Sequence, residues 1–437
     1  MADTNHRSYI IVGAGVFGTS TALHLTRFPD ASVTLIDRDA WDAPRRVAAS
    51  WDWNKVVRAD YRDPVYCGLA LAAQDVWRAD PLWRPFYRET GVYWISRTGF
   101  AQAVLNNYRR LGRPTEGKLF ALPVAEAKTR YEGVFDEADY TGVENVLVNT
   151  TSGWADAKGA LRAVTQRAVE LGVKFVTAEI EALEFDAEGA CVGVRTASGE
   201  TYTAAHTILS TGAFTPKLLE QTAESTRKDA FRAGDRIIAA GVTTGLAQLD
   251  DETAKEFAQM PVCIQEIPPE RGASNGTLPP NEENKLKWWG QYIFKNMQTI
   301  SGHQISAPPA AADYAQWEVP DALVQDVEFA NKVTFGKRGE NWKITQHRIC
   351  WDAVTPSEDF IISPHAASKG LYVATCGSFH GWKFFPVIGD YVVRMLEGTL
   401  EPDLQRRWAW DRELPDPSKN TDWPRKELKD LWGLQSA

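Results

Sequence analysis

What this chain of 437 residues lacks argues against several classes of protein. No apolar run approaches the ~20 residues that a membrane-spanning helix needs, so we expect no contact with a membrane. Positive charge is not in excess: the formal net charge of −9 disfavours a nucleic-acid partner. The five cysteines are odd in number and have no paired or metal-type spacing, which predicts a reducing compartment and no metal site.

Recognisable targeting signals are lacking as well. No signal peptide precedes the first motif, and the C-terminal Gly-Leu-Gln-Ser-Ala does not match the Ser-Lys-Leu peroxisomal signal, so a cytoplasmic protein is expected. No internal repeat or low-complexity tract is visible. The chain is longer than the ~250–300 residues at which a single core stops growing, which predicts two domains.

The most specific pattern lies in residues 9–37. A β-branched run enters a turn with Gly13, Gly15 and Gly18, a helical segment follows, and a second apolar run ends at Asp37. In a dinucleotide-binding unit these glycines permit a sharp turn, a close approach to the pyrophosphate, and tight helix–strand packing, in that order. An acid at position 37 can accept hydrogen bonds from a ribose diol, which favours FAD or NAD over NADP. The motif alone leaves FAD and NAD open.

Similar patterns continue along the chain. Residues 51–58 are predicted to form a loop that leads to a helix at 61–77. A helix at 157–171 and a strand at 173–178 should extend the nucleotide-binding sheet, and a three-stranded antiparallel meander should follow. Residues 220–340 are rich in turn prolines and glycines, which predicts a separate antiparallel domain.

The predicted fold class is α/β, or α+β overall, with a Rossmann-type cofactor domain interleaved with an antiparallel-sheet substrate domain. The boundaries place residues 1–88, 152–219 and 345–437 in the cofactor domain and residues 89–151 and 220–344 in the substrate domain. The buried strand Leu371–Thr375 enters a second glycine-rich turn and a helix, and such a strand end is where α/β folds place ligands.

The chain has seventeen tryptophans. Six of these tryptophans lie near the predicted site segments. They either pack in the core or line an aromatic pocket for cofactor and substrate, and core packing is the more common role of a tryptophan. They are Trp51, Trp53, Trp288, Trp289, Trp351 and Trp382.

A resemblance to a known family rests on two further motifs near the C-terminus. These are Cys-x-x-x-x-Thr-Pro and Gly-x-x-His-Gly-x-Lys, formed by Cys350, Thr355, Pro356, Gly377, His380, Gly381 and Lys383. With the N-terminal motif, they resemble the flavin amine oxidases. That family includes monomeric sarcosine oxidase, the pipecolate and saccharopine oxidases, and the fungal fructosyl amino acid oxidases called amadoriases. The similarity spans essentially the whole chain, and the length is closest to the amadoriase branch.

The resemblance implies roles for individual residues. Cys350 would carry FAD through a thioether, although a buried free thiol is the simpler interpretation of a lone cysteine. Lys55 would lie near the reactive face of the flavin, and Lys383 would place positive charge where superoxide develops. Arg58 would pair with the substrate carboxylate, since a guanidinium binds a carboxylate through two parallel hydrogen bonds. A surface position is the alternative for Arg58 and Lys383.

The predicted site has three sets of residues. The predicted catalytic residues are Lys55, Arg58 and Lys383. The predicted FAD contacts are Gly13, Gly15, Val16, Phe17, Gly18, Asp37, Arg38, Asp52, Asn54, Lys55, Val176, Gly212, Cys350, Gly377, Ser378, His380, Gly381, Trp382 and Lys383. The predicted substrate contacts are Arg58, Trp289 and Gln291.

Departures from the amadoriase pattern bear on the substrate. Gln291 stands where amadoriases have an acid, and Ala409 stands where they have the first arginine of a Trp-Arg-Trp-Arg segment. Both losses remove charges expected to hold a fructosyl amino acid. We therefore expect oxidation of secondary amines, N-methyl or saccharopine-like L-amino acids, with transfer of a hydride to flavin and reduction of O₂ to H₂O₂. A fructosyl amino acid oxidase is the alternative, and an NAD-linked dehydrogenase or a non-catalytic flavin-fold protein is the alternative from another class. A monomer is expected.

Overall fold

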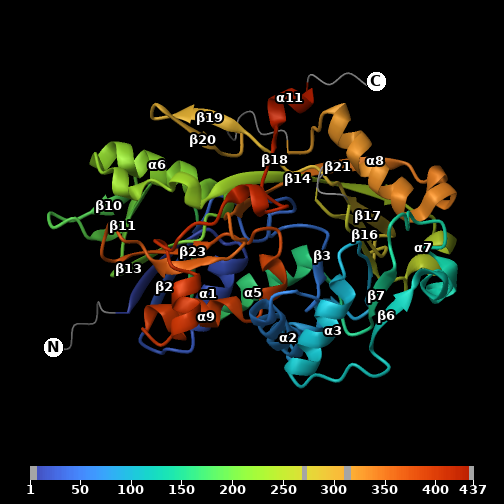
Figure 1. Cartoon of the computed structure of the whole chain (residues 1–437). Coiled ribbons are helices and arrows are strands. Elements are labelled where there is room, and N and C mark those ends of the chain that lie inside the picture. The colour runs from blue at the N-terminus through green and yellow to red at the C-terminus, as the bar shows by residue number, and fades with distance from the viewer. Residues whose placement is uncertain (1–6, 268–272, 310–315, 433–437) are drawn as a thin grey trace.

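A six-stranded sheet forms one half of the computed structural model, which describes residues 7–267, 273–309 and 316–432 (Figure 1). The strand order is β22–β23–β13–β1–β2–β9, parallel except for the antiparallel edge strand β22. The strands are β1 (Ser8–Val12), β2 (Ser32–Asp37), β9 (Lys174–Thr177), β13 (His206–Leu209), β22 (Ile361–Pro364) and β23 (Leu371–Thr375). This arrangement confirms the predicted Rossmann-type architecture.

The two faces of this sheet are covered differently, because successive side chains of a strand point to opposite faces. Ile11 and Leu35 pack against α1 (Val16–Leu25), α5 (Ala157–Glu170) and α9 (Ile388–Leu396). On the other face, Ile10 and Leu209 pack against the meander and α6 (Thr215–Thr226). The predicted meander is confirmed as β10 (Ile180–Phe185), β11 (Cys191–Thr196) and β12 (Thr201–Thr203).

A ten-stranded, mostly antiparallel sheet forms the other half. Its order is β24–β18–β14–β17–β16–β15–β5–β7–β6, with β21 paired to β14. The strands are β5 (Val92–Ile95), β6 (Leu119–Pro123), β7 (Asn145–Asn149), β14 (Ile238–Gln248), β15 (Val262–Gln265), β16 (Asn275–Leu278), β17 (Lys285–Trp289), β18 (Phe294–Lys295), β21 (Ile344–Val354) and β24 (Lys426–Glu427). Helix α8 (Asp321–Phe335) packs on this sheet through Val327 and Phe335, which contact Trp288 and its neighbours.

A small sheet corrects one expectation. The stretch 51–58 was predicted to be a loop, but it contains β3 (Asn54–Val57), which pairs with β8 (Gly153–Asp156); β4 (Tyr87–Arg88) completes the sheet. The prediction failed because the partner strand lies about a hundred residues further along the chain. The next helix, α2 (Pro64–Ala79), begins three residues later than predicted, because Asp63 caps the amides of Val65 and Tyr66.

The remaining elements are peripheral. They are α3 (Phe100–Arg110), α4 (Val124–Ala127), α7 (Asp251–Phe257), β19 (Met297–Ile300), β20 (His303–Ser306), α10 (Pro402–Arg407) and α11 (Leu428–Trp432). The C-terminal pentapeptide and parts of the stretch 220–340 (268–272 and 310–315) lie outside the described residues. In the described part of the chain, no helix is both long and apolar enough to cross a membrane. The predicted domain boundaries stay a prediction.

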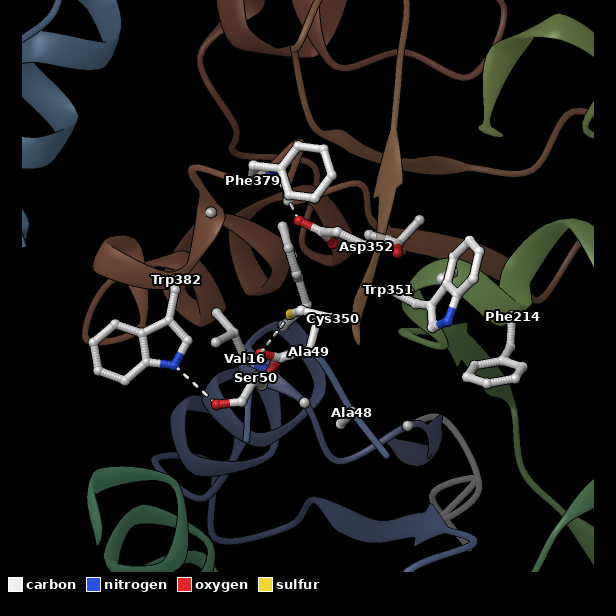
Figure 2. A pocket seen from close by; sticks show the side chains of 18 of the residues that line it. Val16, Ala48, Ala49, Ser50, Phe214, Cys350, Trp351, Asp352, Phe379 and Trp382 are labelled. Atoms are coloured by element: carbon white, nitrogen blue, oxygen red, sulfur yellow. Dashed lines mark hydrogen bonds between the residues drawn. The ribbon is translucent and has the colours of Figure 1, made fainter. Parts of the chain in front are cut away.

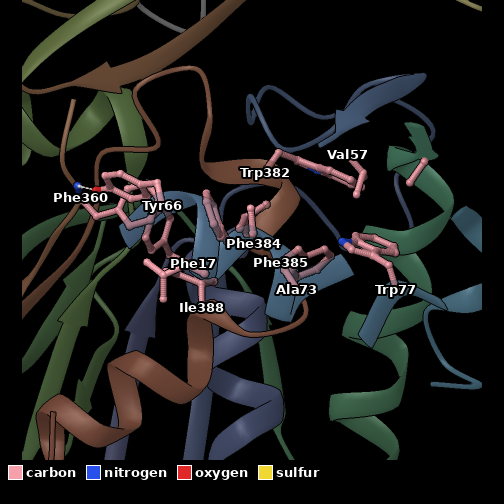
Figure 3. Packing of buried hydrophobic residues seen from close by; sticks show 14 of the residues in the cluster. Phe17, Val57, Tyr66, Ala73, Trp77, Phe360, Trp382, Phe384, Phe385 and Ile388 are labelled. Carbon is pink, nitrogen blue, oxygen red and sulfur yellow. Dashed lines mark hydrogen bonds between the residues drawn. The ribbon is translucent and has the colours of Figure 1, made fainter. Parts of the chain in front are cut away.

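Aromatic side chains join α1, α2 and the segment after β23 into one core (Figure 3). Trp77 of α2 stacks on Trp382 with ring centroids 5.3 Å apart. Tyr66 of α2 and Phe17 of α1 pack edge-on against Phe360, at 5.3 and 5.5 Å. The segment that carries the Gly-x-x-His-Gly-x-Lys motif is therefore held firmly by packing.

Candidate active site

A cavity of about 590 Å³ lies between the two large sheets. Its floor is formed by residues at or just beyond the carboxyl ends of the parallel strands, among them Gly13, Asp37, Ala178, Ser210 and Gly377. Because these strands are parallel, their carboxyl ends meet at one edge of the sheet, which is where open α/β sheets bind ligands. The opposite wall comes from β14, β17 and β21.

The first glycine-rich turn has the predicted geometry at two positions. Gly13 has a φ of +102°, and a Cβ there would lie 2.4 Å from the carbonyl oxygen of Ser210. A Cβ at Gly18 would lie 1.9 Å from the carbonyl oxygen of Gly13. Asp37 already accepts two hydrogen bonds, from the amides of Ala14 at 2.7 Å and Asp39 at 2.9 Å. Its Oδ2 also lies 3.1 Å from a guanidinium nitrogen of the buried Arg46. A carboxylate has about four acceptor positions, so Asp37 can still accept from a ribose.

Buried polar atoms without a partner test whether this cavity suits a dinucleotide. The hydroxyl of Ser210, beside Gly13, and both polar atoms of the Asn54 side chain have no hydrogen-bond partner among the described residues. All of them are buried on residues that line the cavity. Buried polar groups are normally satisfied, so these orphans indicate a ligand with polar groups along its length. The donor set fits FAD.

Two lysines share one carboxylate next to Asn54. The Oδ2 atom of the fully buried Asp52 lies 2.7 Å from Nζ of Lys287 and 2.9 Å from Nζ of Lys55, and Lys287 also donates to the Asn54 carbonyl at 2.9 Å. Burial alone would raise the pKa of Asp52, but the two ammonium groups hold it below its usual value. Burial lowers the pKa of Lys287 to about 8, although Asp52 opposes this. The cluster carries one net positive charge while both lysines are protonated.

Cys350 lies beside this cluster. It is on β21 at the cavity wall, with Sγ 3.7 Å from Nζ of Lys55 and 3.8 Å from the carbonyl oxygen of Ala49 (Figure 2). The Thr355 that follows is fixed by its neighbours: its hydroxyl donates to the Asp359 carbonyl at 2.8 Å. The thiol is therefore held at the boundary between protein and cavity rather than within a closed core.

A lysine and an arginine flank the side chain of Tyr61. Nζ of Lys383 donates to the Tyr61 hydroxyl at 2.9 Å and to the His380 carbonyl at 2.6 Å. The guanidinium of Arg58 lies 4.8 Å from the Tyr61 ring centroid and 4.6 Å from that of Trp94, and it donates to the Asp60 carbonyl. Burial lowers the pKa of Lys383 well below its usual value, and the charge of Arg58 lowers it further. An anion bound between them would restore the charge of Lys383.

Most of the predicted site residues come together around this cavity. The ones that line it are Gly13, Gly15, Val16, Phe17, Asp37, Arg38, Asn54, Lys55, Arg58, Gly212, Trp289, Cys350, Gly377, His380, Gly381, Trp382 and Lys383. Of the other tryptophans considered, Trp351 lines the cavity, whereas Trp51, Trp53 and Trp288 pack in the core.

Five predicted site residues do not line the cavity. Gly18 packs against the turn, and Asp52 lies behind its two lysines. Val176 is paired with Ile36 on the edge strand β9, and the hydroxyl of Ser378 accepts a hydrogen bond from the amide of Thr355. Gln291 is buried, and its main-chain carbonyl accepts a hydrogen bond from the amide of Ala273. Ala409 does not line the cavity either, so the structure gives Gln291 and Ala409 no contact from which substrate choice follows.

The sequence reasoning missed several cavity residues, notably Lys287, Asp352, Trp94 and Asp422. A signal existed for Lys287. In Lys-Leu-Lys-Trp-Trp (285–289), the alternation of a strand places Leu286 and Trp288 on the apolar face and Lys287 on the other. For Asp352, Trp94 and Asp422, no local sequence pattern indicated a place in the cavity wall.

Comparisons with known proteins agree with this geometry. The family model described as FAD dependent oxidoreductase matches residues 8–395. The L-saccharopine oxidase of Schizosaccharomyces pombe is 27% identical over 444 residues, which covers 95% of each chain. The monomeric sarcosine oxidase of Bacillus sp. is 23% identical, with 92% of this chain and 95% of that protein covered. The structure of a modified fructosyl peptide oxidase from Aspergillus nidulans, in complex with FSA, is 25% identical with a TM-score of 0.82, and the match covers 98% of this chain and 99% of that one.

Proposed function

The chain belongs to the family of FAD-dependent oxidoreductases, and on this premise we propose that it oxidises the C–N bond of N-alkyl L-amino acids. The observation that carries the proposal is the pair formed by the half-buried Arg58 and the buried Lys383, which flank Tyr61 at the wall of the cavity. A planar guanidinium next to an ammonium group is suited to a carboxylate. The family match favours FAD over the NAD-linked alternative.

The cavity residues suggest how FAD would be held. The turn at Gly13 and Gly15, with Asp37, would hold the adenosine and pyrophosphate end, while Asn54, Lys55 and Cys350 would contact the ring end. FAD supplies a two-electron acceptor that O₂ reoxidises, with release of H₂O₂. The protein's part is to bind the amino acid by its carboxylate, to keep water away with Trp289 and Trp351, and to hold positive charge near the ring.

Covalent attachment of FAD through Cys350 is supported by the position of its thiol at the cavity wall. Denatured wild-type protein should keep its yellow colour after acid precipitation, because a thioether survives acid. In Cys350→Ser the flavin should appear in the supernatant, as read by absorbance. Cys376, which is buried and does not line the cavity, offers a matched control: Cys376→Ser should keep the flavin in the pellet. Free extraction of flavin from the wild type would rule out the thioether.

Oxidation of fructosyl amino acids is the second candidate function, and it is favoured by the likeness to the fructosyl peptide oxidase. A screen of H₂O₂ release decides between the two, with N-methyl L-amino acids, saccharopine, fructosyl-valine and fructosyl-lysine as substrates. We expect release with the N-alkyl amino acids. Release with none of the four classes would contradict an amine oxidase. A monomer is proposed by analogy with the monomeric sarcosine oxidase.

A further inference from the structure

Asp352 is a cavity carboxylate that the roles above do not use. It lies on β21 two residues after Cys350, so both side chains are on one face of the strand, and both line the cavity. Its Oδ2 accepts from the amide of Phe379 at 2.8 Å and its Oδ1 from the amide of Ala353 at 2.9 Å (Figure 2). Each oxygen has a further acceptor position, so the carboxylate can bind a donor in the cavity.

The turn that holds Asp352 also holds Lys383. The amide of Phe379 donates to Asp352, and the carbonyl of the next residue, His380, accepts from Nζ of Lys383 at 2.6 Å. Asp352 and Lys383 therefore line the same cavity and are joined by one turn, and the charged group nearest to Asp352 is Lys55. In an N-alkyl amino acid the nitrogen and the carboxylate share the α-carbon. A carboxylate bound at Arg58 and Lys383 accordingly leaves the nitrogen in the cavity that Asp352 lines.

The backbone of this turn is unusual. Cys376, Ser378 and Phe379 have φ values of 70°, 45° and 59°, although none of them is glycine. Such conformations persist only where the surroundings hold them, and they cluster at functional sites. The hydrogen bond from Phe379 to Asp352 is one of the contacts that hold it.

We propose that Asp352 binds the secondary ammonium group of the substrate and accepts a proton from it, a role that rests on the function proposed above. One N–H bond breaks, its electron pair stays on nitrogen, and an O–H bond forms on Asp352, which becomes a neutral carboxylic acid. The neutral amine then has the lone pair that oxidation of the adjacent C–H bond requires. Burial raises the pKa of Asp352, against the opposing effects of the two amides and Lys55, and a raised pKa makes it a better proton acceptor.

The neighbouring charged groups distinguish Asp352 from the other acids. Its titratable neighbours are Lys55 on β3, Cys350 on its own strand and Cys376 in the turn, while β14 presents Ala240 opposite it. Asp422 also lines the cavity, but its charged neighbours are Arg58 and Glu358 rather than Lys55.

The test compares wild type with Asp352→Asn, which removes the charge but keeps an acceptor oxygen for the turn. The probes are N-methyl-L-phenylalanine and its thioether isostere 2-(methylthio)-3-phenylpropanoate, which cannot be protonated. Anaerobic mixing gives the rate of flavin reduction by the amine and the dissociation constant of the amine. Competition with the amine gives the dissociation constant of the thioether. In Asp352→Asn, we expect the ratio of the reduction rate to the dissociation constant of the amine to fall on the order of 10²-fold. The affinity for the thioether should stay within about twofold of the wild-type value.

The pH profile separates a chemical role from a structural one. Without the Asp352 carboxylate, only amine that is already neutral in solution reacts. In Asp352→Asn, the ratio of the reduction rate to the dissociation constant should therefore rise about tenfold per pH unit below the pKa of the amine. The wild type should show a flatter profile. Glu358→Gln, at a carboxylate near Arg58 that does not line the cavity, should retain the wild-type profile. Equal loss of amine and thioether affinity, or an unchanged profile in Asp352→Asn, would overturn the role. Wild-type flavin that no N-alkyl amino acid reduces would instead overturn the proposed function, and this role with it.

Discussion

Replacing Arg58 by alanine should raise KM for N-methyl-L-phenylalanine by about 10²–10³-fold, while turnover of the decarboxylated amine, N-methylphenethylamine, changes little. The guanidinium is held between the Tyr61 and Trp94 rings, with Lys383 bound to the same tyrosine. Loss of one partner of such a desolvated ion pair typically costs ~2–5 kcal/mol, which is the expected range in affinity. Steady-state kinetics with the acid and the amine measure the difference.

Two further variants sharpen this result. Arg58→Lys keeps the charge but loses the two parallel hydrogen bonds, so its KM should lie between those of the wild type and the alanine variant. Lys383→Met should also weaken binding of the acid more than that of the amine, because the carboxylate restores the charge of Lys383. Equal losses for the acid and the amine in Arg58→Ala would mean that Arg58 only supports the packing around Tyr61.

Replacing Lys287 by methionine should slow reoxidation of reduced flavin by O₂ about 10²-fold or more, while anaerobic reduction changes only a few-fold. The variant leaves Asp52 and Lys55 as a neutral pair, so the cluster loses its net positive charge. We expect that charge to stabilise developing superoxide. Because the pKa of Lys287 is about 8, wild-type reoxidation should be fast below this pH and should fall as the pH rises through it. Rapid mixing with oxygenated buffer measures both effects.

Measuring the reoxidation of reduced flavin by O₂ in Lys383→Met decides whether Lys287 or Lys383 supplies the positive charge for oxygen reduction. The sequence predicts the oxygen-activating role for Lys383, and nothing in the structure tests it. Its lowered pKa and its place beside Arg58 favour a role in substrate binding instead. If Lys383→Met slows reoxidation and Lys287→Met does not, the charge near O₂ comes from Lys383 and the assignment to Lys287 is wrong.

The features that could be predicted from the sequence are those that local patterns specify. The turn at Gly13 and Gly18, the strand Leu371–Thr375 and the meander all rest on residues close together in the chain, and the structure confirms them. The cysteine and lysine motifs near the C-terminus pointed to the same cavity as the N-terminal glycines, because parallel strands end at one edge of the sheet.

The features that could not be predicted depend on pairing across the chain. Strand β3 exists because β8 pairs with it, and Lys287 becomes significant only through Asp52, 235 positions away. Val176 was predicted as a cofactor contact; it lies on the edge strand β9 and does not line the cavity, whereas Ala178, just beyond the strand end, does. Similarly, Asp352 gains its position from a turn that follows β23.

The preference for N-alkyl amino acids is tested most directly by internal competition. The wild-type enzyme is given N-methyl-L-phenylalanine and fructosyl-valine together at equal concentration in air, and the depletion of each is followed by mass spectrometry. The ratio of the two depletion rates is the ratio of their kcat/KM values, independent of enzyme concentration. Both compounds carry an α-carboxylate and a secondary amine, so the preference rests on Gln291 and Ala409, which replace the charged residues expected to hold the sugar. Without those charges, the N-methyl amino acid should disappear first. Depletion of fructosyl-valine alone would contradict the proposed function and favour a fructosyl amino acid oxidase.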